Sequence, residues 1–461
     1  MAAISRHGRP GSKKVWCLSP INLLICFMLV MGLVYVQVSV WMLSGSFSPK
    51  SSNSNSGHSP NEVHQRRVKD AEELTNSRQH EHVQKQKQQQ TLLKQHYSDW
   101  RKYAVELAGK FPEDIIQILR TEDPFGVRTF EKRLLETESS QGRFLTLEEL
   151  KGLFPCPGNE GERITLPDQR NHDKAQAFRN GTEPYFLFFQ HLRKAGGTNF
   201  CTLATKNFEK KNLPKYYCMP DYHWDMTPPR GAGYLTRYKN SEIIQHMKEN
   251  QHKIAGNEWD PFDHSRFFDL PAAFATSFRR PLDRALSQFR FECIENRGCK
   301  IKNVTKWWNK RRDLTDVYTW TFSNDGIRKM FIGHDKESSE KRQELLGTAL
   351  DTVAKFNLVM VMEWLAYAPQ HVKDVLGFQN TATLTERVRP HIGQAKRHDG
   401  QEHNSLGAAG IAKASWTPED YLPPDLYEIM SRDLALDEIL TDAARRIFLE
   451  RLVCSDVHRF D

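Results

Sequence analysis

A short basic and glycine-rich stretch, HLRKAGGTNFC (191–201), combines residue types that are suited to binding an anion. It follows the apolar run PYFLFFQ (184–190), which predicts a buried strand. A strand that ends in a glycine turn and enters a helix directs several backbone N–H groups at one point, and the helix dipole adds positive potential there. Lys194 would add a full charge. The alternative is a tight strand-to-helix turn in which Arg193 and Lys194 are merely solvated.

A second stretch, AAFATSFRRPLDRALSQFRFE (272–292), places arginines where an apolar strand meets a helix. The run 272–278 predicts a strand, and Pro281 is suited to the first position of the following helix. Arg279 at the strand end and Ser287 in the second helical turn could then hold one phosphate from two sides. The alternative is a surface helix with solvated arginines.

The two stretches together resemble the nucleotide-binding motifs of sulfotransferases that use 3′-phosphoadenosine 5′-phosphosulfate (PAPS). The family form K-x-G-[TSG]-T corresponds to 194–198, and R-x-P-x-x-R-x-x-S-x-[YFW] corresponds to 279–289. The likeness is strongest to Golgi carbohydrate sulfotransferases of the heparan sulfate O-sulfotransferase type (6-O and 2-O). The segment DLALDEILTDAARRIFLERL (433–452) is similar to their closing helix, and the resemblance covers about 185–460.

The resemblance implies that PAPS donates a sulfuryl group to an acceptor hydroxyl by an in-line displacement. By analogy with phosphoryl transfer, positioning and electrostatic stabilisation should dominate. Lys194 would stabilise charge on the leaving phosphate oxygen and is therefore a catalytic candidate, and no metal is expected. The residues that the resemblance assigns to the nucleotide are Arg193, Lys194, Ala195, Gly196, Gly197, Thr198, Asn199, Arg279 and Ser287.

The sequence departs from the family at three places. Ala195 stands where Thr or Ser is common, which should cost little if backbone amides bind the phosphate. Arg280 replaces an acidic residue or Asn, which predicts a more basic site. The catalytic His of the 2-O and 6-O enzymes has no clear counterpart, because the corresponding stretch KIAGNEWDPFDHSRFF (253–268) offers Asn257 and Glu258 instead.

The acceptor hydroxyl must lose its proton to a carboxylate or imidazole within hydrogen-bond reach. Glu258, His223 and His264 are the candidates. Trp259 beside Glu258 would exclude water and raise a carboxyl pKa toward neutrality. His223 has the better intrinsic pKa but lies further from the second motif. Glu258 could alternatively be a solvated carboxylate or a partner for Arg266.

Other functions make different demands on the sequence. A P-loop kinase or NTPase needs G-x-x-x-x-G-K-[ST], with Lys after the second Gly, whereas Lys194 precedes both glycines. A catalytically inactive sulfotransferase-fold protein that binds glycans stays open because of Asn257. A tyrosine or protein sulfotransferase also stays open, since the motifs do not identify the acceptor.

The N-terminal part predicts a membrane anchor and a stem. Residues 15–49 contain no charged side chain, and the apolar run 18–43 is long enough to cross a bilayer. Basic residues precede it, so the tail 1–17 should be cytosolic and the rest luminal. We expect an uncleaved signal anchor of a single-pass type II Golgi membrane protein, with a cleaved signal peptide as the alternative.

The polar stretch that follows the anchor is rich in Ser, Asn and Gln and predicts a stem over 44–110, with few apolar residues to form a core. The stem is a place where two copies of the chain could associate. The luminal sulfotransferase domain is then expected over 111–461, starting somewhere between 100 and 185.

A luminal location favours disulfide bonds and glycosylation. Six of the eight cysteines lie outside the anchor region, and the spacing allows a local argument only for Cys293 and Cys299, in CIENRGC. Asn180 and Asn303 begin glycosylation sequons.

The sequence indicates the chemical class of the acceptor substrate but not its identity. The formal net charge is +8, of which the cytosolic tail carries half, so basic runs at 309–313 and 386–398 are more informative than the total. Such runs would attract an anionic polysaccharide or glycan, and no nucleic-acid partner is expected. Trp307 and Trp308 would stack on sugars, or else lie in the core.

The fold expected is α/β, with a mostly parallel central sheet flanked by helices and a P-loop-like strand-loop-helix. The best strands are 185–190, 272–278 and 356–362, with a further strand over 252–255. Their near-continuous apolar character is typical of strands buried on both faces. In such a sheet the ligand binds beyond the carboxyl ends of the strands, where both motifs lie.

Overall fold

The computed structural model describes residues 100–154, 156, 165–214, 218, 238–258, 260–295, 299–301, 303–323, 338–385 and 417–454. The chain divides into two units, Met1–His82 and Val83–Asp461, and the described residues all belong to the second. Among them no helix has the length and apolar character needed to span a membrane. The expected anchor at 18–43 and most of the expected stem lie outside the described residues.

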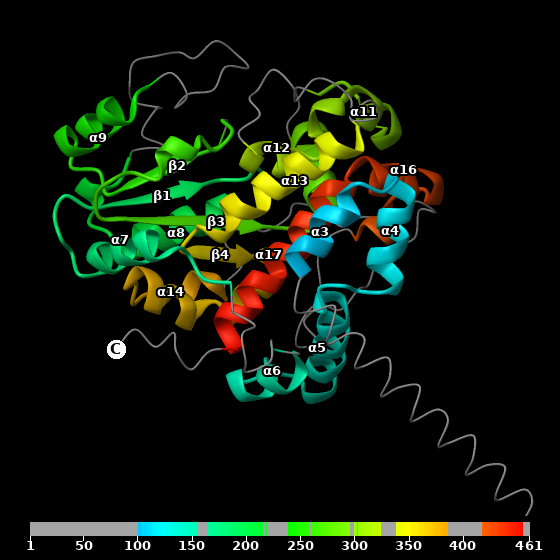
Figure 1. Cartoon of the computed structure of the whole chain (residues 1–461), viewed down its shortest axis with the longest axis horizontal. Coiled ribbons are helices and arrows are strands. Elements are labelled where there is room, and N and C mark those ends of the chain that lie inside the picture. The colour runs from blue at the N-terminus through cyan, green and yellow to red at the C-terminus, as the bar shows by residue number, and fades with distance from the viewer. Residues whose placement is uncertain are drawn as a thin grey trace, which may run out of the picture. The chain divides into compact units, whose positions relative to one another are not determined.

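A parallel sheet of four strands forms the centre of the described unit. Its strands are β1 (Phe186–Gln190), β2 (Ile254–Asn257), β3 (Ala272–Phe278) and β4 (Leu358–Val361), in the order β2-β1-β3-β4. All three pairings are parallel, and every strand residue is buried. Figure 1 shows β1, β3 and β4 pointing the same way, with α9 (Asn240–Glu249) near β2. The expected α/β fold is confirmed, with all pairings parallel.

Helices follow two of the strands directly. α8 (Gly197–Asn207) follows β1, and α10 (Pro281–Phe289) follows β3, with Pro281 at its first position as expected. β4 instead continues into the 3₁₀ helix η9 (Met362–Tyr367) before α14 (Pro369–Leu376) begins. The other helices are α3 (Trp100–Ala108), α4 (Pro112–Thr121), α5 (Val127–Gln141), α6 (Leu147–Leu153), α7 (Gln169–Arg179), α11 (Val304–Lys310), α12 (Val317–Ser323), α13 (Ser339–Ala354), α15 (Pro418–Tyr421), α16 (Pro424–Asp433) and α17 (Ala435–Val453).

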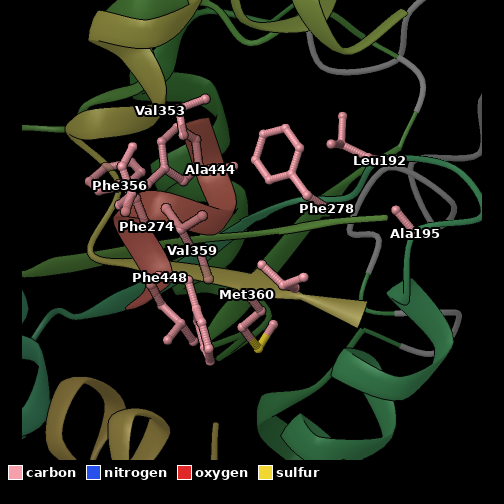
Figure 2. Packing of buried hydrophobic residues seen from close by; sticks show 14 of the residues in the cluster. Leu192, Ala195, Phe274, Phe278, Val353, Phe356, Val359, Met360, Ala444 and Phe448 are labelled. Atoms are coloured by element: carbon pink, nitrogen blue, oxygen red, sulfur yellow. The ribbon is translucent and has the colours of Figure 1, made fainter. Parts of the chain in front are cut away.

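The C-terminal helix α17 is an internal helix. Almost all of its 19 residues are buried, charged ones included, and it packs against β4, α13 and α3. Figure 2 shows Ala444 and Phe448 of α17 beside Phe274 and Val359 of the sheet. This helix coincides with the segment 433–452 that resembles the closing helix of the sulfotransferases.

The folded core extends to the first described residues. Trp100, Ala104 and Leu107 of α3 are buried and belong to the same hydrophobic cluster as the sheet. α3 and α17 lie side by side (Figure 1). Residues 100–110, which the composition places in the stem, therefore contribute helix α3 to this core.

Three pairs of cysteines lie at disulfide distance. They are Cys156–Cys454, Cys201–Cys218 and Cys293–Cys299. The third is the pair that the local spacing predicts. The first joins positions 298 residues apart and ties the segment before α7 to the end of α17, which no local spacing could indicate.

Candidate functional site

The strand order places a topological switch point at the carboxyl ends of β1 and β3, where open parallel sheets are expected to have a binding crevice, and we call this region the crevice. From β1 the chain goes to β2 on one side, and from β3 it goes to β4 on the other side. β1 and β3 are neighbours, so the loops after them flank the topological switch point, where open parallel sheets bind ligands. The stretch 191–196 follows β1, and Arg279 follows β3. Both motifs thus come to one place, as the sequence predicts.

The loop between β1 and α8 leaves no room for side chains at its two glycines. Gly196 has φ +100°, and a Cβ there would lie 2.2 Å from the sulfur of Met362. A Cβ on Gly197 would lie 1.6 Å from Nε2 of His191. Close packing from both sides therefore requires glycine at both positions.

The start of α8 offers its backbone donors to the crevice. Gly196 is the N-cap of α8, and a glycine has no side chain to accept hydrogen bonds from the N–H groups of the first turn. Lys194 also has a positive φ of 64°, which helps to reverse the chain ahead of the helix. First-turn amides that have no side-chain cap, together with a nearby ammonium, suit a phosphate or sulfate group.

Contacts from β3 hold this loop. The hydroxyl of Ser277 donates to the carbonyl of Ala195, and Nη1 of Arg279 donates to the carbonyl of Lys194 over 3.4 Å. Ala195 itself is fully buried. Its small side chain is thus part of the packing, and the loop carbonyls rather than a Thr or Ser hydroxyl connect the two motifs.

Arg279 is held at the strand end but is not enclosed. Tyr318 of α12 donates its hydroxyl to the carbonyl of Arg279 over 3.0 Å. The side chain of Arg279 is 18% exposed, and its Nη2 lies 3.8 Å from the carboxylate of Asp283. Ser287, one helical turn beyond Asp283 on α10, is half-buried. Asp283 and Ser287 thus lie one turn apart on α10, and Arg279 from the end of β3 approaches the first of them.

Arg280 does not make the crevice more basic, contrary to the expectation from sequence. Its guanidinium pairs with Glu131 of α5, and its backbone N–H donates to Glu363 of η9 over 2.9 Å. Burial would raise the pKa of Glu131, but the charges of Arg445 and Arg280 outweigh it and lower that pKa to about 2. The extra arginine is therefore neutralised by a buried carboxylate from another helix.

Lys194 lies over an aromatic ring that sequence analysis did not single out. Its Nζ is 4.3 Å from the ring centroid of Phe291, a cation–π distance. Phe291 stands on the π-helical turn η5 (Arg290–Glu295), which continues α10. π-Helical turns occur often at functional sites. The turn brings the end of the second motif to the lysine of the first.

Glu258 lies at the same edge of the sheet, directly after β2. Its Oε1 is 3.5 Å from Nε of Arg193 and 4.0 Å from Nδ1 of His191, and its side chain is 17% exposed. Arg266, the alternative partner, instead donates to the carbonyl of Tyr238 and to Asn240. Of the two candidate bases that the structure describes, Glu258 and His264, Glu258 is the one that lies at the first motif.

The structure describes only one of the other two candidate bases, His264. His223 lies outside the described residues, as does Trp259. Nε2 of His264 lies 2.8 Å from Oγ1 of Thr352 and 3.2 Å from the carbonyl of Phe322, so its ring is engaged by α13 and α12. Asn257, which precedes Glu258 at the end of β2, donates its amide to Gln190.

Several residues considered for the acceptor or the nucleotide have structural roles. Trp307 and Trp308 are buried, and their indole N–H groups donate to Glu292 and Asp433. These tryptophans are therefore core residues, as the alternative interpretation had it. The amide of Asn199 donates to the carbonyl of Thr383, so its side chain holds a neighbouring loop.

The remaining sequence predictions concern the surface. Asn180 and Asn303 are both exposed, at the end of α7 and at the N-cap of α11. Glycosylation of these two asparagines stays a prediction, and their exposure is compatible with it. The basic run 386–398 lies outside the described residues, whereas Arg311 and Arg312 in the run 309–313 pair with acidic side chains.

Comparison of the chain with protein-family models, curated proteins and solved structures gave no match. Function is therefore inferred from the motifs and the geometry of the site alone.

Proposed function

We propose that this protein is a PAPS-dependent O-sulfotransferase that transfers a sulfuryl group to a hydroxyl of an anionic polysaccharide or glycan. The observation that carries the proposal is the meeting of three elements at one switch point. The glycine cradle with Lys194, the arginine end of β3 and the carboxylate of Glu258 follow the carboxyl ends of β1, β3 and β2.

PAPS supplies an activated sulfuryl group whose bond to a phosphate oxygen breaks as a bond to the acceptor oxygen forms. The first-turn amides of α8 and the ammonium of Lys194 would stabilise the charge that develops on the leaving oxygen. Arg279 and Ser287 would hold the 3′-phosphate away from the reacting bond. Glu258 would take the proton of the acceptor hydroxyl.

The location is part of the same proposal. An anchor at 18–43 and a stem would place the domain in the Golgi lumen, where the three cysteine pairs could be oxidised. A full-length protein that stays in the membrane through carbonate washing would support an uncleaved anchor. Recovery of only soluble protein that begins near residue 45 would support a cleaved signal peptide.

A catalytically inactive glycan-binding protein is the second candidate, and Asn257 favours it. The stretch nearest to the place of the catalytic histidine in the enzymes that the motifs resemble offers this amide instead, and it is bonded within the protein to Gln190. Retention on PAPS-coupled beads and transfer of radiolabelled sulfate to a panel of desulfated glycans separate the candidates. A sulfotransferase passes both tests, and a glycan-binding protein transfers no sulfate. Sulfate on tyrosine peptides alone would identify a protein sulfotransferase.

Two substitutions test the roles of the motifs. Lys194→Ala should lower turnover about 10²–10³-fold and weaken product-nucleotide binding much less, because its charge matters most at the leaving oxygen. Arg279→Ala should chiefly weaken binding, and a nucleotide without the 3′-phosphate should show little further loss. Lys206→Ala, an exposed position on α8, is the matched control. Normal PAPS binding by both motif variants would refute the assignment.

A further inference from the structure

His191 connects the glycine cradle to Glu258. It directly follows β1, its backbone N–H donates to the carbonyl of Asn257 over 2.9 Å, and its side chain is 9% exposed. The imidazole stacks on Phe189 with ring centroids 5.6 Å apart and an interplanar angle of 17°. Strand pairing and stacking thus fix the position of the ring.

The two ring nitrogens face different parts of the site. Nδ1 is buried, lies 4.0 Å from Oε1 of Glu258 and has no hydrogen-bond partner among the described residues. Nε2 packs against Gly197, the first residue of α8, so closely that a Cβ on this glycine would lie only 1.6 Å away. One nitrogen therefore faces a carboxylate, and the other faces the positive end of a helix.

This arrangement determines the protonation of the ring. Burial lowers the pKa of His191; Glu258 opposes that shift, and Arg193 and Lys194 reinforce it. The ring is then neutral near pH 7 and carries one N–H. The carboxylate favours a proton on Nδ1, and the helix N-terminus favours a lone pair on Nε2. Both preferences select the same tautomer.

We propose that His191 is a positioning residue for Glu258: when an acceptor binds, the 4.0 Å gap closes to hydrogen-bond distance, and Nδ1–H donates to the carboxylate and draws it from Arg193 toward the acceptor hydroxyl. Arg193 Nε lies 3.5 Å from the same oxygen, so the two donors compete for it. A carboxylate held by the neutral imidazole keeps an oxygen available to accept a proton. The inference rests on the proposed function, because Glu258 is the base there.

Two amide substitutions separate the roles of the two nitrogens. Asn places an amide near the position of Nδ1, whereas Gln extends it toward the position of Nε2. His191→Asn should keep most of the turnover. His191→Gln should lose about tenfold, the effect of losing one hydrogen bond to a charged group. The acid limb of its kcat/KM profile should also move to higher pH, because the carboxylate has lost a donor.

Both variants remove the ring that packs on Gly197, so any loss of PAPS affinity should be similar in the two. His264→Gln is the control for a histidine that α12 and α13 engage. Equal turnover and equal pH profiles for wild type and His191→Gln would overturn the inference while the sulfotransferase function stands. Equal losses in Asn and Gln would also overturn it, since they would show a purely structural role. A wild type without sulfate transfer to any acceptor would instead refute the proposed function.

A measurement that does not depend on enzyme activity tests the contact between His191 and Glu258. In the full chain labelled with ¹⁵N-histidine, the His191 signals, identified by their loss in His191→Asn, should show the proton on Nδ1. Glu258→Gln should move the His191 titration to lower pH, because the carboxylate raises that pKa. A proton on Nε2, or a titration that Glu258→Gln does not move, would contradict the proposal.

Discussion

The charged groups of the crevice and those of α17 are held in different ways. On α17, Arg446 donates to Glu450 over 2.6 Å with both side chains fully buried, and Arg445 pairs with Glu131 over 3.0 Å. In the crevice, Arg279 lies 3.8 Å from Asp283, and Arg193 lies 3.5 Å from Glu258. These crevice side chains keep 6–29% of their surface exposed.

This difference separates structural charges from charges that can change partners. A buried pair at hydrogen-bond distance cannot lose one member without leaving the other desolvated. At 3.5–4.0 Å the crevice contacts are longer than good hydrogen bonds, so a ligand could take the place of the partner without breaking one. The buried network on α17 supports the site through Glu131, which pairs with Arg445 of α17 and with Arg280 of the second motif.

The largest effect on stability should come from breaking a pair on α17. Arg446→Met leaves Glu450 buried without its arginine and should lower the free energy of unfolding by about 3–5 kcal/mol. Arg143→Met, at the exposed pair with Glu149, is the control and should change little. Denaturant unfolding measures both. Equal small losses would show that the two kinds of pair do not differ.

Removing the crevice carboxylate should affect rate rather than stability. Glu258→Gln keeps the size of the side chain but removes its basic oxygen, so turnover should fall about 10²-fold or more. PAPS affinity and the thermal midpoint should hold, with Glu249→Gln on the exposed end of α9 as control. Near-normal turnover, together with its collapse in His223→Ala, would transfer the role of base to His223.

A paired substitution tests the packing of the cradle. Gly197→Ala should weaken PAPS binding about tenfold or more, because the added methyl group overlaps the ring of His191. Removal of the ring in the double variant Gly197→Ala/His191→Ala should recover part of that binding. Calorimetric titration with the product nucleotide gives both affinities. A double variant as weak as Gly197→Ala would show that backbone strain, not the imidazole, requires glycine.

The smallest effect concerns Asp316 and Asp437, which join α12 to α17. Asp437 accepts from the backbone of Tyr318 and Thr319, and Asp316 accepts from the backbone N–H of Asp437. Burial raises the pKa of Asp316 from 3.8 to about 8, and burial together with the charge of Asp316 raises that of Asp437 to about 7. The folded chain thus binds protons that the unfolded chain releases above pH 4.

The free energy of unfolding should therefore fall as pH rises from about 4 through about 8. The thermal midpoint should drop by a few degrees between pH 6 and pH 9, and Asp316→Asn should flatten that dependence. Stability that rises over this range would mean that both carboxyls are ionised in the folded chain. Tyr318 also holds Arg279, so nucleotide binding should weaken together with the fold.

Sequence analysis predicted those parts of the site that depend on short stretches of the chain. The runs 184–190 and 272–278 are apolar enough to mark buried strands, and each is followed by residues suited to an anion. Parallel strands bring their carboxyl ends to one edge, so the convergence of Lys194 and Arg279 could be predicted without coordinates. The role of Arg280 could not, because its partner Glu131 lies on a helix far away in the sequence.

The sequence by itself determined the α/β class, three of the four strands closely, the two motifs and the disulfide pair Cys293–Cys299, since each depends on neighbours along the chain. Only the tertiary structure decided which charges face the crevice and which are neutralised. It also brought His191 between Gly197 and Glu258, and it buried Trp307 and Trp308. These outcomes depend on packing between distant segments, and a side chain's type does not specify the neighbour it will meet.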